Sequence, residues 1–207
     1  QEVLYVSGEE SAGQIRLRAE RLSSQGAENL SLVGSTSADD IAATIQAGNY
    51  ALVIVDSMQT VAMAEVASAP GTVSQITNSA NIIIRAAKAT HTATVLVGHV
   101  TKEGSIAGPK VLEHIVDVVL QFEGDRYGGF KMLRAAKNRY GSTAEVALLE
   151  MDGSGLREVE NASASLLAER GSSDGSVVLA TMEGNRPLLV EIQALVNPTH
   201  FGYPKRT

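Results

Sequence analysis

Residues 51–57 have the sequence ALVIVDS, and this stretch decides the predicted fold. An uninterrupted apolar run of this length, ending at an aspartate, predicts a strand that is buried on both faces, as strands of parallel sheets are. Similar apolar runs occur at 3–6 and 93–100. Because helical patterns lie between these strands, the sequence predicts an α/β fold with a three-layer, mostly parallel sheet.

The spacing of apolar residues supports this alternation of strands and helices. In the segments 15–22 and 73–87, apolar residues recur at helical intervals, which is typical of a helix with one buried face. The segment 38–48 follows a Ser-Thr-Ser cap signal and ends at a glycine, so it predicts another helix. A short strand is expected at 30–33.

The pattern changes in the second half of the chain. Strand candidates at 116–124, 128–139 and 143–151 are separated by glycine-containing turns, and they predict an antiparallel extension. The polar segment 170–176, RGSSDGS, predicts a domain boundary. Beyond this segment, a hairpin is expected to turn at residues 183–186.

Composition limits the class of protein. The chain has 207 residues, is 44% hydrophobic, carries a net charge of −6 and lacks cysteine and tryptophan. These values argue against a disulfide framework, a cysteine zinc site within these residues, a uniformly basic nucleic-acid binder and a base-stacking platform. The sequence has neither an apolar run of about 18 residues nor the basic start of a secretion signal, so we expect a cytoplasmic protein with no membrane contact.

Asp56 and two glutamates follow predicted strands. Four apolar residues and then an aspartate is how a Walker B strand presents a carboxylate to Mg²⁺, although Asp56 also fits a cap of the next element. Glu9 and Glu10 end the first strand, where a carboxylate can polarise a water toward a phosphate. They equally fit the start of a helix near Ser11, because carboxylates stabilise helix N-termini.

Three other basic or ionisable residues are candidates. His99 follows VLVG at the tip of the strand expected at 93–100 and lies at the same predicted sheet edge as the carboxylates, although a lone histidine is often structural. Lys137 and Arg139 are two positions apart on a predicted strand, so they face the same side and suit a phosphate. The alternative is a solvated edge strand that lysine protects from aggregation.

The motifs of the chain resemble one family in order. The stretches VLYVSGEES (3–11), LVIVDSMQT (52–60), VGHVTKEGSIAGPKVLEHIVD (97–117) and KNRYGSTAEV (137–146) are similar to those of the bacterial RadA (Sms) DNA-repair ATPases, relatives of RecA. SGLREVENAS and GNRPLLVEIQALV continue the likeness, which covers essentially the whole chain. Tyr140 stands where the family usually has phenylalanine.

The resemblance implies roles for the residues at the predicted sheet edge. Glu9 corresponds to the catalytic glutamate that orients the attacking water, with Glu10 as the alternative. Asp56 corresponds to the Walker B aspartate that supports Mg²⁺, with Ser57 beside it at the nucleotide. His99 occupies the place of a polar γ-phosphate sensor. All of these roles are what the family resemblance implies.

The resemblance also implies contacts with DNA and with a neighbouring subunit. The loop 101–108, with Thr101, Lys102 and Gly104, corresponds to a DNA-binding loop, and 58–72 to a second DNA-facing loop. Lys137 and Arg139 match a motif whose cations reach the nucleotide of the adjacent subunit.

The implied function is an ATP- and Mg²⁺-dependent, helicase-type DNA motor. The family acts in recombination and repair by branch migration, forms rings that are expected to be hexamers, binds single-stranded and branched DNA, and has the recombinase RecA as a candidate partner. Two alternatives remain open: a KaiC-like regulatory ATPase that acts on proteins, and a non-catalytic scaffold.

Parts of the family pattern are missing from these residues. No P-loop, G-x-x-x-x-G-K-[ST], occurs in the 207 residues. Family members also carry a four-cysteine zinc finger and a Lon-protease-like domain. We therefore expect a fragment, with a truncated RecA-like ATPase domain at 1–169 and the start of the Lon-like domain at 170–207. Such a fragment is expected to bind ATP poorly.

Overall fold

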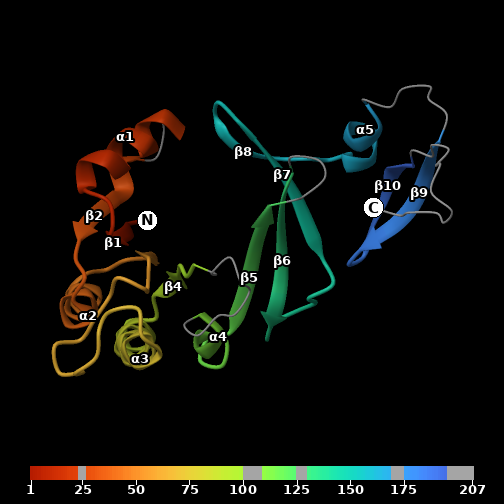
Figure 1. The fold of residues 1–207 in the computed structure, drawn as a ribbon. Helices are drawn as coiled ribbons and strands as arrows, with labels where there is room; N and C mark the ends of the chain where they lie inside the picture. The colour runs from red at the N-terminus through yellow and green to blue at the C-terminus, as the bar shows by residue number, and fades with distance from the viewer. Residues whose placement is uncertain (23–26, 100–108, 125–129, 169–174, 195–207) are drawn as a thin grey trace, which may run out of the picture. The chain divides into compact units, whose positions relative to one another are not determined.

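The computed structural model describes residues 1–22, 27–99, 109–124, 130–168 and 175–194. The chain divides into two compact units, Gln1–Asp117 and Val118–Thr207 (Figure 1). The predicted domain boundary near residue 170 lies inside the second unit, and the assignment of 170–207 to a Lon-like domain stays a prediction.

A parallel sheet organises the first unit. Its strands are β1 (Val3–Ser7), β2 (Leu30–Gly34), β3 (Leu52–Asp56) and β4 (Ala93–Leu96), and its helices are α1 (Ala12–Leu22), η1 (Ala27–Asn29), α2 (Ala38–Ala47), α3 (Val73–Ala89) and α4 (Pro109–Leu112). The strands lie in the order β2-β1-β3-β4, and all pairs are parallel. The predicted α/β fold with a mostly parallel sheet is thus confirmed.

Successive strands are added first on one side of β1 and then on its other side. From β1 the chain passes through α1 to β2 on one side, whereas from β3 it passes through α3 to β4 on the other side. Right-handed crossovers, the rule for parallel strands, place α1 on one face of the sheet and α2 and α3 on the other. The chain therefore leaves β1 and β3 toward opposite faces, and such a switch point opens a crevice at the carboxyl ends of the strands.

The core of the first unit lies between the sheet and the helix pair α2–α3, which run side by side (Figure 1). Alternate residues of β1 and β3 point into it, and apolar residues of the two helices cover them. The largest fully buried members are Leu4, Val6, Ile41, Ile45, Val53, Val55, Met58, Val61, Ile76 and Ile83. Burying each such side chain stabilises the fold by about 1.5–3 kcal/mol.

Local signals in the sequence account for the helix boundaries. The Ser37 side chain accepts a hydrogen bond from the backbone N–H of Asp40, and Thr72 caps Gln75 of α3 in the same way. Gly48 ends α2, as predicted, and its backbone N–H donates to the carbonyl of Thr44. The two side-chain caps satisfy backbone N–H groups at the helix starts, and the Gly48 bond satisfies a carbonyl at the end of α2.

The prediction that residues 93–100 form a strand buried on both faces was wrong. The strand ends at Leu96, Ala93 is exposed, and Val95 is 48% exposed. The physical reason is position: among the described strands, β4 pairs only with β3 and is the last strand of its sheet. An apolar run alone does not distinguish a central strand from an edge strand.

One buried polar side chain fixes the loop between β3 and α3. Gln75 is 2% exposed. Its Oε1 accepts a hydrogen bond from the backbone N–H of Met63 at 3.0 Å, and its Nε2 donates to the carbonyls of Met63, Val66 and Ser68 at 2.9–3.2 Å. These bonds satisfy the polar atoms of a buried side chain and tie it to the part-buried backbone of the loop. The loop is therefore held against the start of α3.

The second unit is mainly antiparallel. It contains β5 (Val118–Gly124), β6 (Lys131–Asn138), β7 (Val146–Asp152) and β8 (Gly155–Glu158) in one sheet, the helix α5 (Ala162–Leu167), and the hairpin β9 (Ser176–Glu183) and β10 (Arg186–Gln193). The predicted hairpin turn at 183–186 is confirmed. The predicted antiparallel strands form a sheet of their own, whose hydrogen bonds are separate from those of the parallel sheet.

The hairpin packs within the second unit and shares its core. Leu188 of β10 is buried with Leu148, Val159 and Ala162. The guanidinium of Arg186 donates to the carbonyl of Glu160 at 2.9 Å. The residues on both sides of the predicted boundary at 170 therefore form one hydrophobic cluster.

Among the described residues, none of the helices has both the length and the apolar character that crossing a bilayer requires.

Replacing Gln75 should destabilise the chain. We expect Gln75→Ala to lower the free energy of unfolding by about 2–3 kcal/mol, because it removes a buried side chain together with its hydrogen bonds to the backbone of the loop. Urea unfolding followed by circular dichroism measures the change. The matched control is Asn78→Ala on the same helix, because Asn78 makes one exposed hydrogen bond to the Ser74 carbonyl. An equal, small effect of both variants would contradict the prediction.

Candidate functional site

The register of β1 and β3 brings the candidate carboxylates together. Ser7, the last residue of β1, pairs with Asp56, the last residue of β3. The next backbone N–H, that of Gly8, donates to the carbonyl of Asp56 at 3.0 Å. Glu9 and Asp56 therefore emerge at the same level of the sheet, at the switch point where the chain leaves the two strands in opposite directions.

Glu9 receives a hydrogen bond from the neighbouring strand end. The hydroxyl of Ser57 donates to Glu9 Oε1 at 2.8 Å, and His99 Nε2 lies 3.7 Å from the same oxygen. Ser57 is fully buried, whereas the side chains of Glu9 and His99 are 49% and 60% exposed. The structure thus brings three of the predicted residues together, from the ends of β1, β3 and β4, with one glutamate carboxylate facing solvent.

Asp56 is held by a tyrosine of the adjacent strand. The hydroxyl of Tyr5 donates to Asp56 Oδ2 at 2.5 Å. Burial raises the pKa of Tyr5 above its ordinary value, and the hydrogen bond to Asp56 raises it further. The hydroxyl therefore remains protonated at neutral pH and remains a donor to the carboxylate.

Glu10 faces a different partner from Glu9. Its Oε1 accepts a hydrogen bond from the Arg18 guanidinium at 2.5 Å, and this bond raises the pKa of Arg18. The side chains of Arg18 and Glu10 are 49% and 36% exposed, so the pair contributes little to stability. The backbone N–H groups of Glu9 and Glu10 both donate to Ser7 Oγ, at 3.3 and 2.9 Å. The shared acceptor fixes the turn that carries both glutamates.

The turn after β1 is also packed against the loop after β3. A Cβ atom at Gly8 would lie 2.0 Å from Thr60 Oγ1 and 2.9 Å from Thr60 Cβ. Thr60 Oγ1 in turn donates to the carbonyl of Ser57 at 2.9 Å. Only glycine fits at position 8, because the two loops are in direct contact there.

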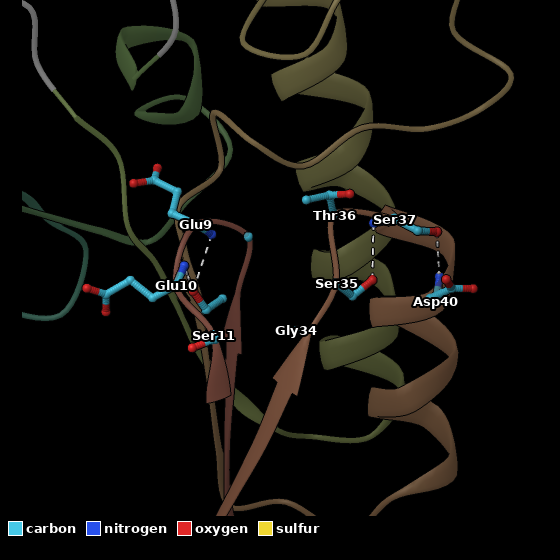
Figure 2. A pocket seen from close by; sticks show the side chains of 10 residues that line it. Glu9, Glu10, Ser11, Gly34, Ser35, Thr36, Ser37 and Asp40 are labelled. Carbon is cyan, nitrogen blue, oxygen red and sulfur yellow. Dashed lines mark hydrogen bonds between the residues drawn. The ribbon is translucent and has the colours of Figure 1, made fainter. Parts of the chain in front are cut away.

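A pocket of about 510 Å³ opens on the other side of the glutamate turn (Figure 2). It lies between the turn at 7–11 and the segment 34–40, and hydroxyl groups and backbone line much of it. Figure 2 shows the side chains of Glu9 and Glu10 pointing away from the wall formed by Ser35, Thr36 and Ser37. The glutamate turn, including Glu9 and Glu10, therefore forms one wall of the pocket.

The site suits Mg²⁺ together with a phosphate. Magnesium is usually bound through one or two carboxylates plus substrate phosphates, rather than by an all-protein cage. In the described part of the chain, no group of three or more histidine, aspartate or glutamate side chains forms such a cage. Asp56 offers a carboxylate oxygen, Oδ1, beside the one that Tyr5 occupies. The residues present therefore fit a metal that a nucleotide brings with it.

The other predicted site residues lie elsewhere. Thr101, Lys102 and Gly104 are outside the described residues. Lys137 and Arg139 belong to the second unit, where β6 ends at Asn138 and Arg139 lies in the following turn. Strand alternation therefore does not define the direction of the Arg139 side chain. The roles given to these residues stay predictions.

Two contributors to the site were missed in the sequence. Tyr5 and Arg18 hold Asp56 and Glu10, respectively. A signal for Tyr5 was available, because it and Ser7 share one face of β1 and Ser7 is the partner of Asp56. Arg18 is eight positions from Glu10, across a turn and a helix, and offered no comparable signal.

The sequence of this chain is similar to a family model and to several known proteins. Residues 1–105 match the family model described as AAA domain. The chain is 52% identical to the DNA repair protein RadA of Bacillus subtilis over 99% of this chain and 44% of the relative. For the RadA proteins of Brucella abortus and Streptococcus pneumoniae the identity is 52% and 48%, over 99% of this chain and 45% and 49% of the relatives. The chain thus spans less than half the length of these relatives.

Solved structures show the same fold at low identity. A KaiC-like protein from Pyrococcus horikoshii has a TM-score of 0.55 and 14% identity, covering 77% of this chain and 76% of its own. The RadB recombinase has a TM-score of 0.56 and 17% identity, covering 77% of this chain and 80% of its own. Both likenesses confirm the RecA-like fold and carry no more than the fold.

A side chain at position 8 should disrupt the glutamate turn. We expect Gly8→Ala to lower the free energy of unfolding by about 2–4 kcal/mol, because its Cβ overlaps Thr60. Thermal and urea unfolding measure the change. The matched control is Gly13→Ala in α1, where nothing lies within 4 Å of the added Cβ. This control should stabilise the chain by about 0.5–1 kcal/mol, since alanine favours helix more than glycine does. Equal free energies of unfolding for the two variants would contradict the close contact between Gly8 and Thr60.

Proposed function

Because this chain belongs to the AAA domain family and matches RadA proteins over essentially its whole length, we propose that it is part of an ATPase of DNA repair and recombination. One observation carries the proposal: Glu9 is held by Ser57 at the switch point of a RecA-like sheet, beside Asp56. A carboxylate at this place suits the activation of a water molecule against a bound phosphate.

The proposed reaction is hydrolysis of the terminal phosphate of ATP. Glu9 orients a water and accepts its proton as the water oxygen bonds to the γ-phosphorus. The bond between that phosphorus and the β–γ bridging oxygen breaks, and ADP and phosphate leave. Asp56 would hold Mg²⁺, which would neutralise charge on the phosphates. Ser57 and His99 lie against the same glutamate oxygen and orient it, and His99 serves as the phosphate sensor.

The structure favours Glu9 over Glu10 as the base. Glu9 contacts Ser57 and His99, which come from the ends of two further strands. Glu10 pairs instead with Arg18 of α1. One Glu10 oxygen is therefore engaged by a guanidinium, away from the ends of β3 and β4.

The remaining parts of the machinery are proposed from the family. The phosphate cradle comes from sequence outside these residues, which contain no P-loop motif. Lys137 and Arg139 reach the nucleotide of a neighbouring subunit in a ring, which we propose to be a hexamer. Such cations in trans accelerate phosphoryl transfer by roughly 10³–10⁵.

DNA is the proposed substrate of the motor. Two loops contact single-stranded or branched DNA: the loop 58–72, and the loop 101–108 through Thr101, Lys102 and Gly104. Because these contacts are made largely to phosphates, DNA binding should weaken as the salt concentration rises. Hydrolysis drives branch migration, with RecA as a candidate partner.

The segment 170–207 begins a Lon-like domain that serves in assembly. The KaiC-like alternative has support from the fold alone, and the scaffold alternative rests on the absence of a P-loop motif from these residues.

The two glutamates should differ sharply in the full-length protein. We expect Glu9→Gln to lower kcat for ATP by at least about 10²-fold, because the general base is lost, while nucleotide binding is retained. Glu10→Gln should lower kcat by less than about 5-fold, a small fraction of a general-base effect. Phosphate release with and without single-stranded DNA measures hydrolysis, and filter binding measures ATP affinity. Loss of hydrolysis in Glu10→Gln alone would make Glu10 the general base. A rate of hydrolysis that neither substitution changes would reject the proposed catalytic site.

Mixing experiments should reveal the action in trans. Full-length Arg139→Ala and Glu9→Gln proteins should each be inactive alone. When mixed, they should regain part of the wild-type rate, because some interfaces combine an intact Arg139 with an intact Glu9. The measurement is ATP hydrolysis against mixing ratio. No recovery at any ratio, with mixed rings verified by native mass spectrometry, would place Arg139 outside the neighbour's site.

A further inference from the structure

The two carboxylates of the site are held by hydroxyl groups in a reciprocal arrangement. Tyr5 of β1 donates to Asp56 of β3 at 2.5 Å, and Ser57, which directly follows β3, donates to Glu9, which follows β1, at 2.8 Å. Each strand thus supplies the carboxylate that is held by a hydroxyl from the other strand.

The sheet register makes this arrangement possible. Tyr5 pairs with Ile54, and Ser7 pairs with Asp56, so Tyr5 and Asp56 are diagonal neighbours on one face of the sheet. A tyrosine side chain is long enough to cross that diagonal. Glu9, two residues beyond the end of β1, is turned back toward β3 because its backbone N–H donates to Ser7 Oγ.

Burial restricts what the two hydroxyls can do. Ser57 is 0% exposed, so its hydroxyl is enclosed and reaches Glu9 rather than a ligand in solvent. Tyr5 is half-buried, and its hydroxyl is engaged by Asp56. Each bond occupies one oxygen of its carboxylate, Oδ2 of Asp56 and Oε1 of Glu9, and the second oxygen of each carboxylate is the one that can face a ligand.

We propose that Tyr5 and Ser57 are positioning residues with separate tasks: Tyr5 orients Asp56 toward the metal, and Ser57 orients Glu9 toward the attacking water. This inference rests on the proposed ATPase function and deepens it. Groups that hold metal ligands through hydrogen bonds typically change metal affinity by roughly 10–100-fold when they are removed. A misplaced general base lowers turnover instead, because orientation is part of its contribution.

The separate tasks predict separate phenotypes in the full-length protein. Tyr5→Phe should weaken Mn²⁺ binding in the presence of a non-hydrolysable ATP analogue by about 10-fold, with kcat largely restored at saturating metal. Ser57→Ala should lower kcat by about 10-fold or more, with the KM for ATP and the Mn²⁺ affinity unchanged. Electron paramagnetic resonance of free Mn²⁺ measures metal affinity independently of turnover.

Two controls guard against a general loss of structure. Tyr50→Phe removes a tyrosine hydroxyl from a residue that packs against the core at the opposite end of β3, and it should change neither quantity. Ser57→Cys keeps the volume of the buried side chain close to that of serine, and it should resemble Ser57→Ala in kcat because a thiol is a weak donor. Thermal unfolding of each variant checks that the fold persists.

The outcomes separate the inference from the proposed function. If the wild-type protein neither hydrolyses ATP nor binds Mn²⁺ with the nucleotide, the ATPase proposal fails, and the inference fails with it. If the wild-type protein does both, but the two variants match it or lose both properties in parallel, only the inference is overturned. The split between metal affinity in Tyr5→Phe and kcat in Ser57→Ala supports it.

Discussion

The parallel pairing of β1 with β3, in the register that sets Ser7 opposite Asp56, is the constraint on which the site depends. Both strands end at the same level, and the chain leaves them toward opposite faces of the sheet. The backbone bond from Gly8 to the Asp56 carbonyl continues the pairing beyond the strands. A shift of one residue would turn every side chain to the opposite face and would separate the carboxylates from their hydroxyl donors.

One face of the parallel sheet packs into the hydrophobic core, and the carboxyl ends of its strands carry the candidate site. Leu4, Val6, Val53 and Val55 are buried under α2 and α3, where they pack against apolar residues of both helices. The polar residues occur just where these apolar strands end. Rigid strands position a side chain at their tips more accurately than a free loop does, and the loops here are themselves tied down. Gln75 binds one loop to α3, and the contact of Gly8 with Thr60 joins that loop to the glutamate turn.

Sequence reasoning succeeded where a single physical signal decided the outcome. Apolar runs that ended in acidic residues located β1 and β3, and the cap signal before Ala38 located α2. Sequence-based prediction failed where the outcome depends on another strand or loop of the fold. The run at 93–100 has the composition of a central strand, but among the described strands β4 has a neighbour on one side only. Gln75 looks like any polar helix residue until the loop that it binds has been placed beside it.

The sequence by itself determined the alternation of strands and helices, the parallel sheet, and Glu9, Asp56 and His99 as candidates at its edge. These follow from local hydrophobic periodicity, which neighbouring residues carry in full. Only the tertiary structure decided that Ser57 and His99 meet Glu9, that Arg18 takes Glu10, and that Tyr5 holds Asp56. Three of these four contacts join residues 48 to 90 positions apart in the chain. Such pairs form only once strand order and register are fixed, and these depend on packing of the whole sheet rather than on any one segment.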